Sequence, residues 1–273
     1  MANDVESTQD VDIYASRSRE YRFIQLETAN GIARLTLNRP PANVLSVEML
    51  EDLNHALETL AFEPAVKVLV LSAVGQYFSA GFELTDHVGD RAYLMLDSFK
   101  RAFENLLKVD RPVLAVVKGS ALGAGSLLVA GCDMALAAGS VRLGFPEIKG
   151  GVFNTVAVAL LPRLCGAKRA FDLIFSGASV TAADAERLGL ITRAVPDEKL
   201  QGEAEALIQR LQETSGPILR LTRKAITGGL HLPFDEAVAH AEDVYLNQLL
   251  ATEDVKEGLR AIAEKRKPAW KDR

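Results

Sequence analysis

The residues best suited to chemistry in this 273-residue chain are one carboxylate and two turns of small residues. Glu147 lies in an apolar segment, Phe145–Ile148, where burial raises a carboxyl pKa and suits the group to general acid/base work. The turns Gly75–Gly81 and Ala121–Gly125 each follow a short apolar strand. Free backbone N–H groups in such turns stabilise an oxygen that becomes negative during a reaction. Two donors beside one carboxylate are the minimum set for making an enolate.

Each of these features also has a plain structural explanation. A Gly-rich turn lets a helix pack closely on a strand without any part in catalysis. Glu147 follows Pro146, and a carboxylate is common where a helix begins. We favour the functional interpretation because the carboxylate and both turns occur together, each beside a predicted buried strand.

Several spaced motifs of this sequence resemble the crotonase family, the enoyl-CoA hydratases and isomerases. They read FSAGFEL at 78–84, RPVLAVVKGSALGAG at 111–125 and FPEI at 145–148. AADAERLGL at 182–190 and EKRKPAW at 264–270 extend the resemblance over about residues 21–273. The resemblance implies an α/β fold: a crotonase-like spiral of ββα units with a C-terminal all-helical oligomerisation region.

The resemblance also assigns roles to the chemistry-bearing residues. The backbone N–H groups of Ala80 and Ala124 would hold the thioester oxygen, and Glu147 would be the acid/base. The family usually has glycine where Ala124 stands, but alanine keeps the N–H that the role requires.

One position departs from the hydratase pattern. Two-carboxylate hydratases have a glutamate where this chain has Leu127, so one proton-transfer group of the pair is missing. A single carboxylate beside an oxyanion hole resembles the isomerases, in which one glutamate moves a proton between two carbons. Yet FPEIKGGVF at 145–153 is similar to the cyclohexadiene-carbonyl-CoA hydratases. Hydration and isomerisation therefore both remain open.

Two further residues are candidates for the missing proton donor. Asp86 and His87 follow the first turn, and two interpretations are open: their loop brings them to the site, or they are an ordinary exposed pair. By resemblance, the acyl and coenzyme groove is lined by Ala42, Val44, Phe82, Gly123, Ser126, Leu127, Val152 and Phe153.

The basic tail, residues 256–273, has an expected role in substrate binding. By resemblance, Lys265 contacts the phosphates of coenzyme A. A solvated helix end is the plain structural alternative, and we favour the phosphate contact. Coenzyme A is part of the substrate, and we expect no separate cofactor and no metal. The four histidines have no zinc-site spacing.

Composition and pattern lead us to expect a globular protein of the cytoplasm. The net charge of −5 lacks the basic signature of nucleic-acid binding. No segment has the length and apolarity of a membrane span or signal peptide. Cys132 and Cys165 lie in apolar helical contexts and are expected to be reduced.

The expected organisation has three parts. Residues 1–20 form a polar N-terminal tail, 21–196 the spiral core with the active site, and 197–273 a region helical to the chain end. A hairpin turns at Asn30–Gly31, and Ser46 and Thr181 cap helices. The resemblance implies a homotrimer or dimer of trimers built by the C-terminal helices.

Other functions are weighed against these residues. An aromatic thioester dehalogenase of this family needs an aspartate within 151–155, and none is present. A serine hydrolase needs a G-x-S-x-G turn, which is also absent. A non-catalytic acyl-CoA binder or scaffold remains the alternative, because Leu127 replaces a catalytic carboxylate. We predict an enzyme that hydrates or isomerises an enoyl- or dienoyl-CoA.

Overall fold

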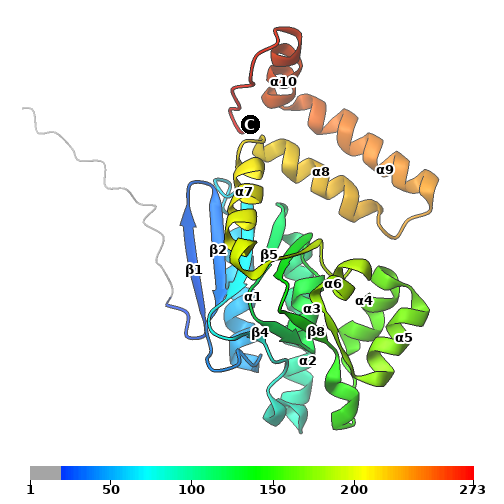
Figure 1. The fold of residues 1–273 in the computed structure, drawn as a ribbon. Helices are drawn as coiled ribbons and strands as arrows, with labels where there is room; N and C mark the ends of the chain where they lie inside the picture. The colour runs from blue at the N-terminus through cyan, green and yellow to red at the C-terminus, as the bar shows by residue number, and fades with distance from the viewer. Residues whose placement is uncertain (1–19) are drawn as a thin grey trace, which may run out of the picture.

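Two β-sheets and the helices that cover them form the core of the protein (Figure 1). The computed structural model describes residues 20–273, so the predicted N-terminal tail lies outside the described residues except for its last position. The six-stranded sheet has the order β1-β2-β3-β5-β7-β10. Its strands are Ile24–Ala29, Ile32–Leu37, Val68–Ala73, Val113–Val117, Met134–Ala138 and Arg193–Val195. The four-stranded sheet, β4-β6-β8-β9, consists of Tyr77–Ser79, Ser120–Leu122, Arg142–Gly144 and Ser179–Thr181.

The chain winds as a spiral, and each turn supplies one strand to each sheet before a helix. The first turn is β3, β4 and α2; the second is β5, β6 and α3; the third is β7, β8 and α4. Successive turns pair in parallel, β3 with β5 with β7 in one sheet and β4 with β6 with β8 in the other. The predicted spiral of ββα units is therefore confirmed. Such winding places the ends of equivalent strands side by side.

The local signals at the start of the chain are also confirmed. β1 and β2 form an antiparallel hairpin in which Ile24 pairs with Leu37. Asn30 and Gly31 turn the chain with positive φ values of 52° and 77°, which asparagine and glycine tolerate best. Alternate side chains of β2 are buried, as its sequence pattern predicts.

The helices begin where their capping residues indicate. Ser46 accepts from the Met49 N–H at the start of α1, and Thr181 accepts from the Asp184 N–H at the start of α6. The helices are α1 (Val47–Ala61), α2 (Asp90–Lys108), α3 (Ala124–Ala130), α4 (Thr155–Cys165), α5 (Ala167–Ser176), α6 (Ala182–Arg187), α7 (Leu200–Gln212), α8 (Gly216–Gly229), α9 (Phe234–Asn247) and α10 (Glu253–Ala263).

The last ten residues are not helical, which corrects the prediction of helix to the chain end. Instead, the segment after α10 folds back on neighbouring helices. Trp270 donates through Nε1 to the Glu213 carbonyl at 2.7 Å, and Asp272 accepts from the Gly216 N–H at 2.9 Å. Lys67 completes the attachment through an ion pair of 2.8 Å with Asp272.

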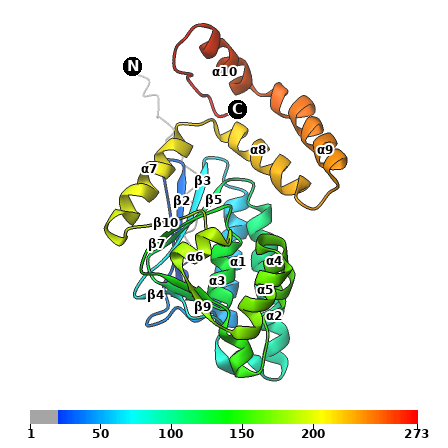
Figure 2. The ribbon, with the colours of Figure 1, turned by 45° about the vertical axis from the view of Figure 1, so that its right-hand side comes forward.

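Helix α7 packs on the six-stranded sheet, whereas α8, α9 and α10 project away from the core (Figures 1 and 2). Several large apolar side chains on these projecting helices are exposed, among them Phe234 at 85 %. Cys132 and Cys165 are free thiols. None of the helices within residues 20–273 is long and apolar enough to cross a bilayer.

One buried cation holds α8 to the core. Arg223 is 8 % exposed and donates to the Leu106, Leu107 and Val109 carbonyls at the end of α2. Its Nε also pairs with Asp133 at 2.7 Å. The guanidinium thereby satisfies the last carbonyls of α2, which have no intrahelical partner.

We expect Arg223→Met to lower the free energy of unfolding by about 3 kcal/mol, because it leaves buried carbonyls without their donor and Asp133 without its ion partner. Urea denaturation at fixed protein concentration measures the change. The control is Arg193→Met, whose ion pair with Glu203 is 44 % and 41 % exposed, and which should lose about 0.5 kcal/mol. Equal losses in both variants would contradict the anchoring role of Arg223.

Candidate active site

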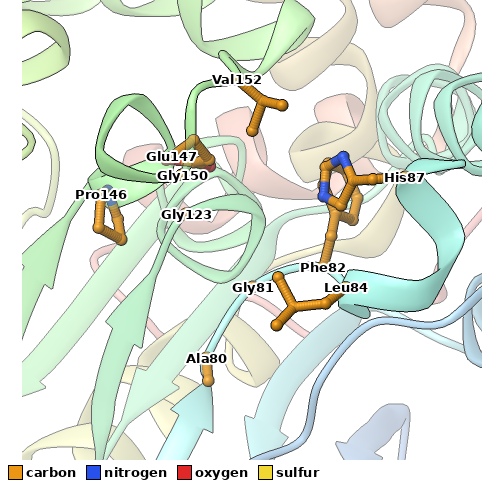
Figure 3. A pocket seen from close by; sticks show the side chains of 10 residues that line it. All are labelled: Ala80, Gly81, Phe82, Leu84, His87, Gly123, Pro146, Glu147, Gly150 and Val152. Atoms are coloured by element: carbon orange, nitrogen blue, oxygen red, sulfur yellow. The ribbon is translucent and has the colours of Figure 1, made fainter.

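A pocket of about 370 Å³ opens where the turns after β4, β6 and β8 meet (Figure 3). Glu147 lies on one side of it and His87 on the other. The lining is mostly apolar, and its residues are Ala80, Gly81, Phe82, Leu84, His87, Gly123, Pro146, Glu147, Gly150 and Val152. An apolar pocket with a few convergent polar groups is the usual form of a small-molecule site.

Two backbone segments approach closely at the floor of this pocket. A Cβ on Gly81, whose φ is +99°, would stand 3.2 Å from the Leu122 carbonyl oxygen. A Cβ on Gly125 would stand 2.6 Å from the Ser79 Cβ, closer than side chains allow. Glycine at both positions therefore lets the turn after β4 lie against the turn after β6.

The amide groups of these turns correct one predicted role. The Ala80 N–H donates to the Ala42 carbonyl at 2.9 Å, so it is not available to a substrate. The Phe82 N–H, two residues further on, has no hydrogen-bond acceptor within residues 20–273. The parallel bridge between Leu45 and Phe82 explains this. Its two hydrogen bonds join Leu45 to the Gly81 carbonyl and to the Glu83 N–H, so the Phe82 N–H points away from Leu45.

The second predicted donor remains available. Ala124 is the first residue of α3, and its N–H has no acceptor in the part of the chain that the structure describes. The first N–H groups of a helix have no intrahelical partner. Two unpaired amides, those of Phe82 and Ala124, therefore adjoin the pocket.

Glu147 lies in a short 3-10 helix, Pro146–Gly150, directly after β8. Its carboxyl oxygen Oε1 is buried and has no hydrogen-bond partner among the described residues. A Cβ on Gly123 would stand 2.6 Å from this oxygen, so the carboxyl group lies against the second turn. Burial raises the pKa of Glu147 above its ordinary value, and the Asn154 side chain partly offsets this. A carboxyl group in such surroundings suits proton transfer near neutral pH.

Of the two predicted candidates Asp86 and His87, only His87 lines the pocket. Asp86 is fully buried, accepts from the Val47 N–H at 2.9 Å and pairs with Arg91, so it neither faces the pocket nor forms an exposed loop. His87 lines the pocket, and its ring stands 5.9 Å from that of Phe82 in an edge-to-face contact. Asp86 thus holds the loop that presents His87.

Three predicted acyl-pocket residues lie elsewhere. Ser126 is fully buried, donates to the Ala121 carbonyl at 2.6 Å and accepts from the Gly144 N–H at 3.1 Å, which joins α3 to β6 and β8. Leu127 is fully buried in the core cluster. The Phe153 side chain is 59 % exposed and outside the lining, where its neighbour Val152 is found instead.

The predicted coenzyme contacts also lie outside this pocket. Ala42 and Val44 use their carbonyls within the protein, Ala42 for the Ala80 N–H and Val44 for the Arg39 guanidinium at 2.8 Å. Lys265 follows α10 on the projecting helices and has no ion pair within residues 20–273. In a single chain, therefore, Lys265 and Glu147 do not belong to one pocket.

Sequence reasoning missed Leu84 and Asn154, whereas Val152, expected with Phe153 to shape the acyl pocket, is part of the lining. Leu84 also lines the pocket, but a single apolar residue in a short 3-10 helix carries no chemical signal. Asn154 caps α4, accepting from the Val156 and Ala157 N–H groups. An asparagine before an apolar helical run indicates such a cap. Within residues 20–273, no three His, Cys, Asp or Glu side chains are placed to hold a metal ion.

A spiral of ββα units that joins unpaired amides to a buried carboxyl group defines the crotonase class, and comparisons with known proteins agree. Residues 27–273 match the family model described as enoyl-CoA hydratase/isomerase. The chain belongs to the enoyl-CoA hydratase/isomerase family.

Named relatives share the whole length of the fold. A probable enoyl-CoA hydratase of Rhizobium meliloti is 33% identical over 93% of this chain and 99% of its own. The cyclohexa-1,5-dienecarbonyl-CoA hydratase of Thauera aromatica is 32% identical over 92% of this chain and 96% of its own. The crystal structure of an enoyl-CoA hydratase from Bacillus anthracis superposes with a TM-score of 0.87 at 28% identity, covering 92% of this chain and all of the other.

We expect Gly123→Ala to disrupt the site. The residue has a φ of +53°, which costs an alanine about 1–2 kcal/mol, and its new Cβ would displace the Glu147 carboxyl group. Turnover of an enoyl-CoA should fall about 100-fold or more, since a misplacement of about 1 Å has that effect. Gly202→Ala is the control, because nothing lies within 4 Å of its new Cβ. Equal activity of the two variants would contradict the placement of Glu147 against Gly123.

Proposed function

We propose that this protein hydrates or isomerises an enoyl-CoA or cyclic dienoyl-CoA ester through an enolate. The observation that supports it most is the Glu147 carboxyl group, buried against Gly123 beside two unpaired amides. The Thauera relative, named a cyclohexa-1,5-dienecarbonyl-CoA hydratase, supports a cyclic acyl group as one candidate. In this scheme coenzyme A enters as the thioester part of the substrate, and it is not a separate cofactor.

In the proposed reaction, the thioester oxygen accepts hydrogen bonds from the Phe82 and Ala124 N–H groups. For isomerisation of a 3-enoyl ester, ionised Glu147 removes a proton from the carbon next to the thioester, and the C–H electron pair moves toward the oxygen to form the enolate. Glu147 then returns the proton to the fourth carbon, and the double bond moves into conjugation. For hydration of a 2-enoyl ester, the enolate forms instead when the oxygen of water adds to the third carbon, and a proton then goes to the second carbon. The two amides stabilise the charge that develops on the oxygen; removing one such donor typically costs about 3–4 kcal/mol.

Hydration needs a group that handles the proton of water as well as the proton given to carbon. Leu127 cannot supply it, because it has no ionisable group and is fully buried. His87 is the other titratable side chain of the described pocket lining, and it faces Glu147 across the pocket (Figure 3). We assign to His87 the role of second proton-transfer group if the reaction is hydration.

The assembly and location extend the same proposal. Exposed apolar side chains on α8 and α9, such as Ile226, Phe234 and Leu246, favour burial against further copies of the chain in a homotrimer or dimer of trimers. In that assembly the basic tail with Lys265 serves the site of another copy, where it binds the phosphates of coenzyme A. We place the enzyme in the cytoplasm.

Glu147→Gln should lower turnover by 10²- to 10⁴-fold while acyl-CoA binding persists, because only the proton-transfer group is removed. Mass spectrometry in deuterated water, with 2-enoyl-, 3-enoyl- and cyclohexadiene-carbonyl-CoA, separates a mass gain of one water from deuterium incorporation alone. Glu27→Gln, on an exposed part of β1, is the control. Water addition that is lost in His87→Gln would assign hydration and the second group.

The same assay tests the main alternative. A non-catalytic acyl-CoA binder, favoured by the loss of a family carboxylate at Leu127, would change none of the three esters and still bind them. That outcome would overturn the proposed activity.

Lys265→Ala should weaken acyl-CoA binding about tenfold, the effect of one lost charge-assisted contact. A thioester of pantetheine, which lacks the nucleotide, should bind equally to variant and wild type. Calorimetry of both ligands measures this, with Lys100→Ala, 73% exposed on α2, as the control. Equal weakening of both ligands would contradict a phosphate contact.

A further inference from the structure

Asn154 is a buried amide whose orientation the structure fixes. It is 4 % exposed and stands just before α4. Its Oδ1 accepts from the Val156 N–H at 2.9 Å and the Ala157 N–H at 3.3 Å. Because both partners are donors, the oxygen must face the helix, and the Nδ2 group must point away from it.

That Nδ2 group is one of two buried polar atoms left without a partner in this corner of the described structure. The other is Oε1 of Glu147. One is a donor and the other an acceptor, and each alone costs free energy when buried unpaired. The intervening loop returns the chain on itself, with the Gly151 N–H bonded to the Ile148 carbonyl and the Val152 N–H to that of Glu147. This turn brings the chain at Asn154 back toward Glu147, and the Asn154 amide lowers the Glu147 pKa that burial raises.

We propose that Asn154 is a positioning residue whose Nδ2 group donates a hydrogen bond to the Glu147 carboxylate and holds it toward the pocket. The inference rests on the proposed function, in which Glu147 is the acid/base. Catalytic hydrogen bonds of unliganded enzymes are often long and shorten when substrate excludes water. The cap fixes the donor in advance, so orienting the carboxylate requires no rearrangement of α4.

The role has a definite effect on proton transfer. A donor to the carboxylate favours its charged form, so its loss shifts the balance toward the protonated acid. His87 is the other titratable side chain in the described lining, and it is present in every variant compared. The acidic limb of the pH–rate profile therefore moves to higher pH when the Asn154 donor is removed.

Two substitutions separate this role from helix capping. Asn154→Ser keeps an oxygen that caps α4 and lacks the amide donor; Asn154→Asp keeps shape and cap and replaces the donor with an acceptor. We expect kcat to fall about 10- to 100-fold with KM little changed, and the acidic limb to rise by about one pH unit in Ser and further in Asp. Thr181→Asp, a capping change at α6 outside the pocket, is the matched control.

A second readout does not depend on turnover. In protein carrying ¹³C at glutamate side-chain carboxyls, the Glu147 signal is assigned by its loss in Glu147→Gln and titrated in each variant. A midpoint raised in both Asn154 variants and unchanged in Thr181→Asp supports the role. Identical midpoints in wild type and Asn154→Asp overturn it, whatever the activity. If the wild type turns over no ester while both Asn154 variants show raised midpoints, the proposed function is refuted and the hydrogen bond is still supported.

Discussion

The site depends on the close approach of two backbone segments that lie some forty residues apart in sequence. β4 and β6 pair in parallel, with Ser79 opposite Ala121, and the turns that follow them lie in contact. Any side chain at Gly125 would force these turns apart. Because amide donors act only when they converge on one point, this contact determines whether the Phe82 and Ala124 N–H groups serve one oxygen. The spiral supplies the contact, since consecutive turns must place equivalent strands next to each other.

The unpaired Glu147 carboxyl group lowers the stability of the protein, and packing elsewhere in the fold offsets this. The Oε1 atom of Glu147 is buried without a hydrogen-bond partner among the described residues, an arrangement that favours the protonated form and stabilises nothing by itself. The stabilising free energy lies elsewhere, in the core of leucines and valines between the six-stranded sheet and its helices. Strained or unsatisfied groups of this kind gather at functional sites because function, and not stability, requires them.

The sequence predicted what local patterns determine. Hairpin, caps and repeating strand–strand–helix units follow from alternation and capping residues, and Glu147 stands out as a carboxylate among apolar neighbours. The sequence could not predict which residues pair over long distances along the chain. Nothing near Ala80 shows that its N–H bonds to Ala42, 38 positions earlier, which moves the free amide to Phe82. Asp86 and His87 are adjacent in sequence but lie in different surroundings. The Asp86 carboxylate is buried because it binds Arg91 and the first N–H of α1, whereas the His87 ring lines the pocket.

Leucine at position 127 removes one proton-transfer group and still leaves Glu147 for the proposed chemistry. The leucine is fully packed in the core and has no ionisable group, so its side chain does not transfer a proton. In the reaction that we propose, proton transfer then passes through Glu147 alone or through Glu147 and a group on the opposite wall. The first route suffices for moving a double bond, since the same proton leaves and returns. Addition of water sets a stricter condition, because oxygen must reach a carbon while a proton reaches its neighbour. The choice between the two reactions therefore rests on whether His87, held by the loop that Asp86 anchors, stands within reach of that water.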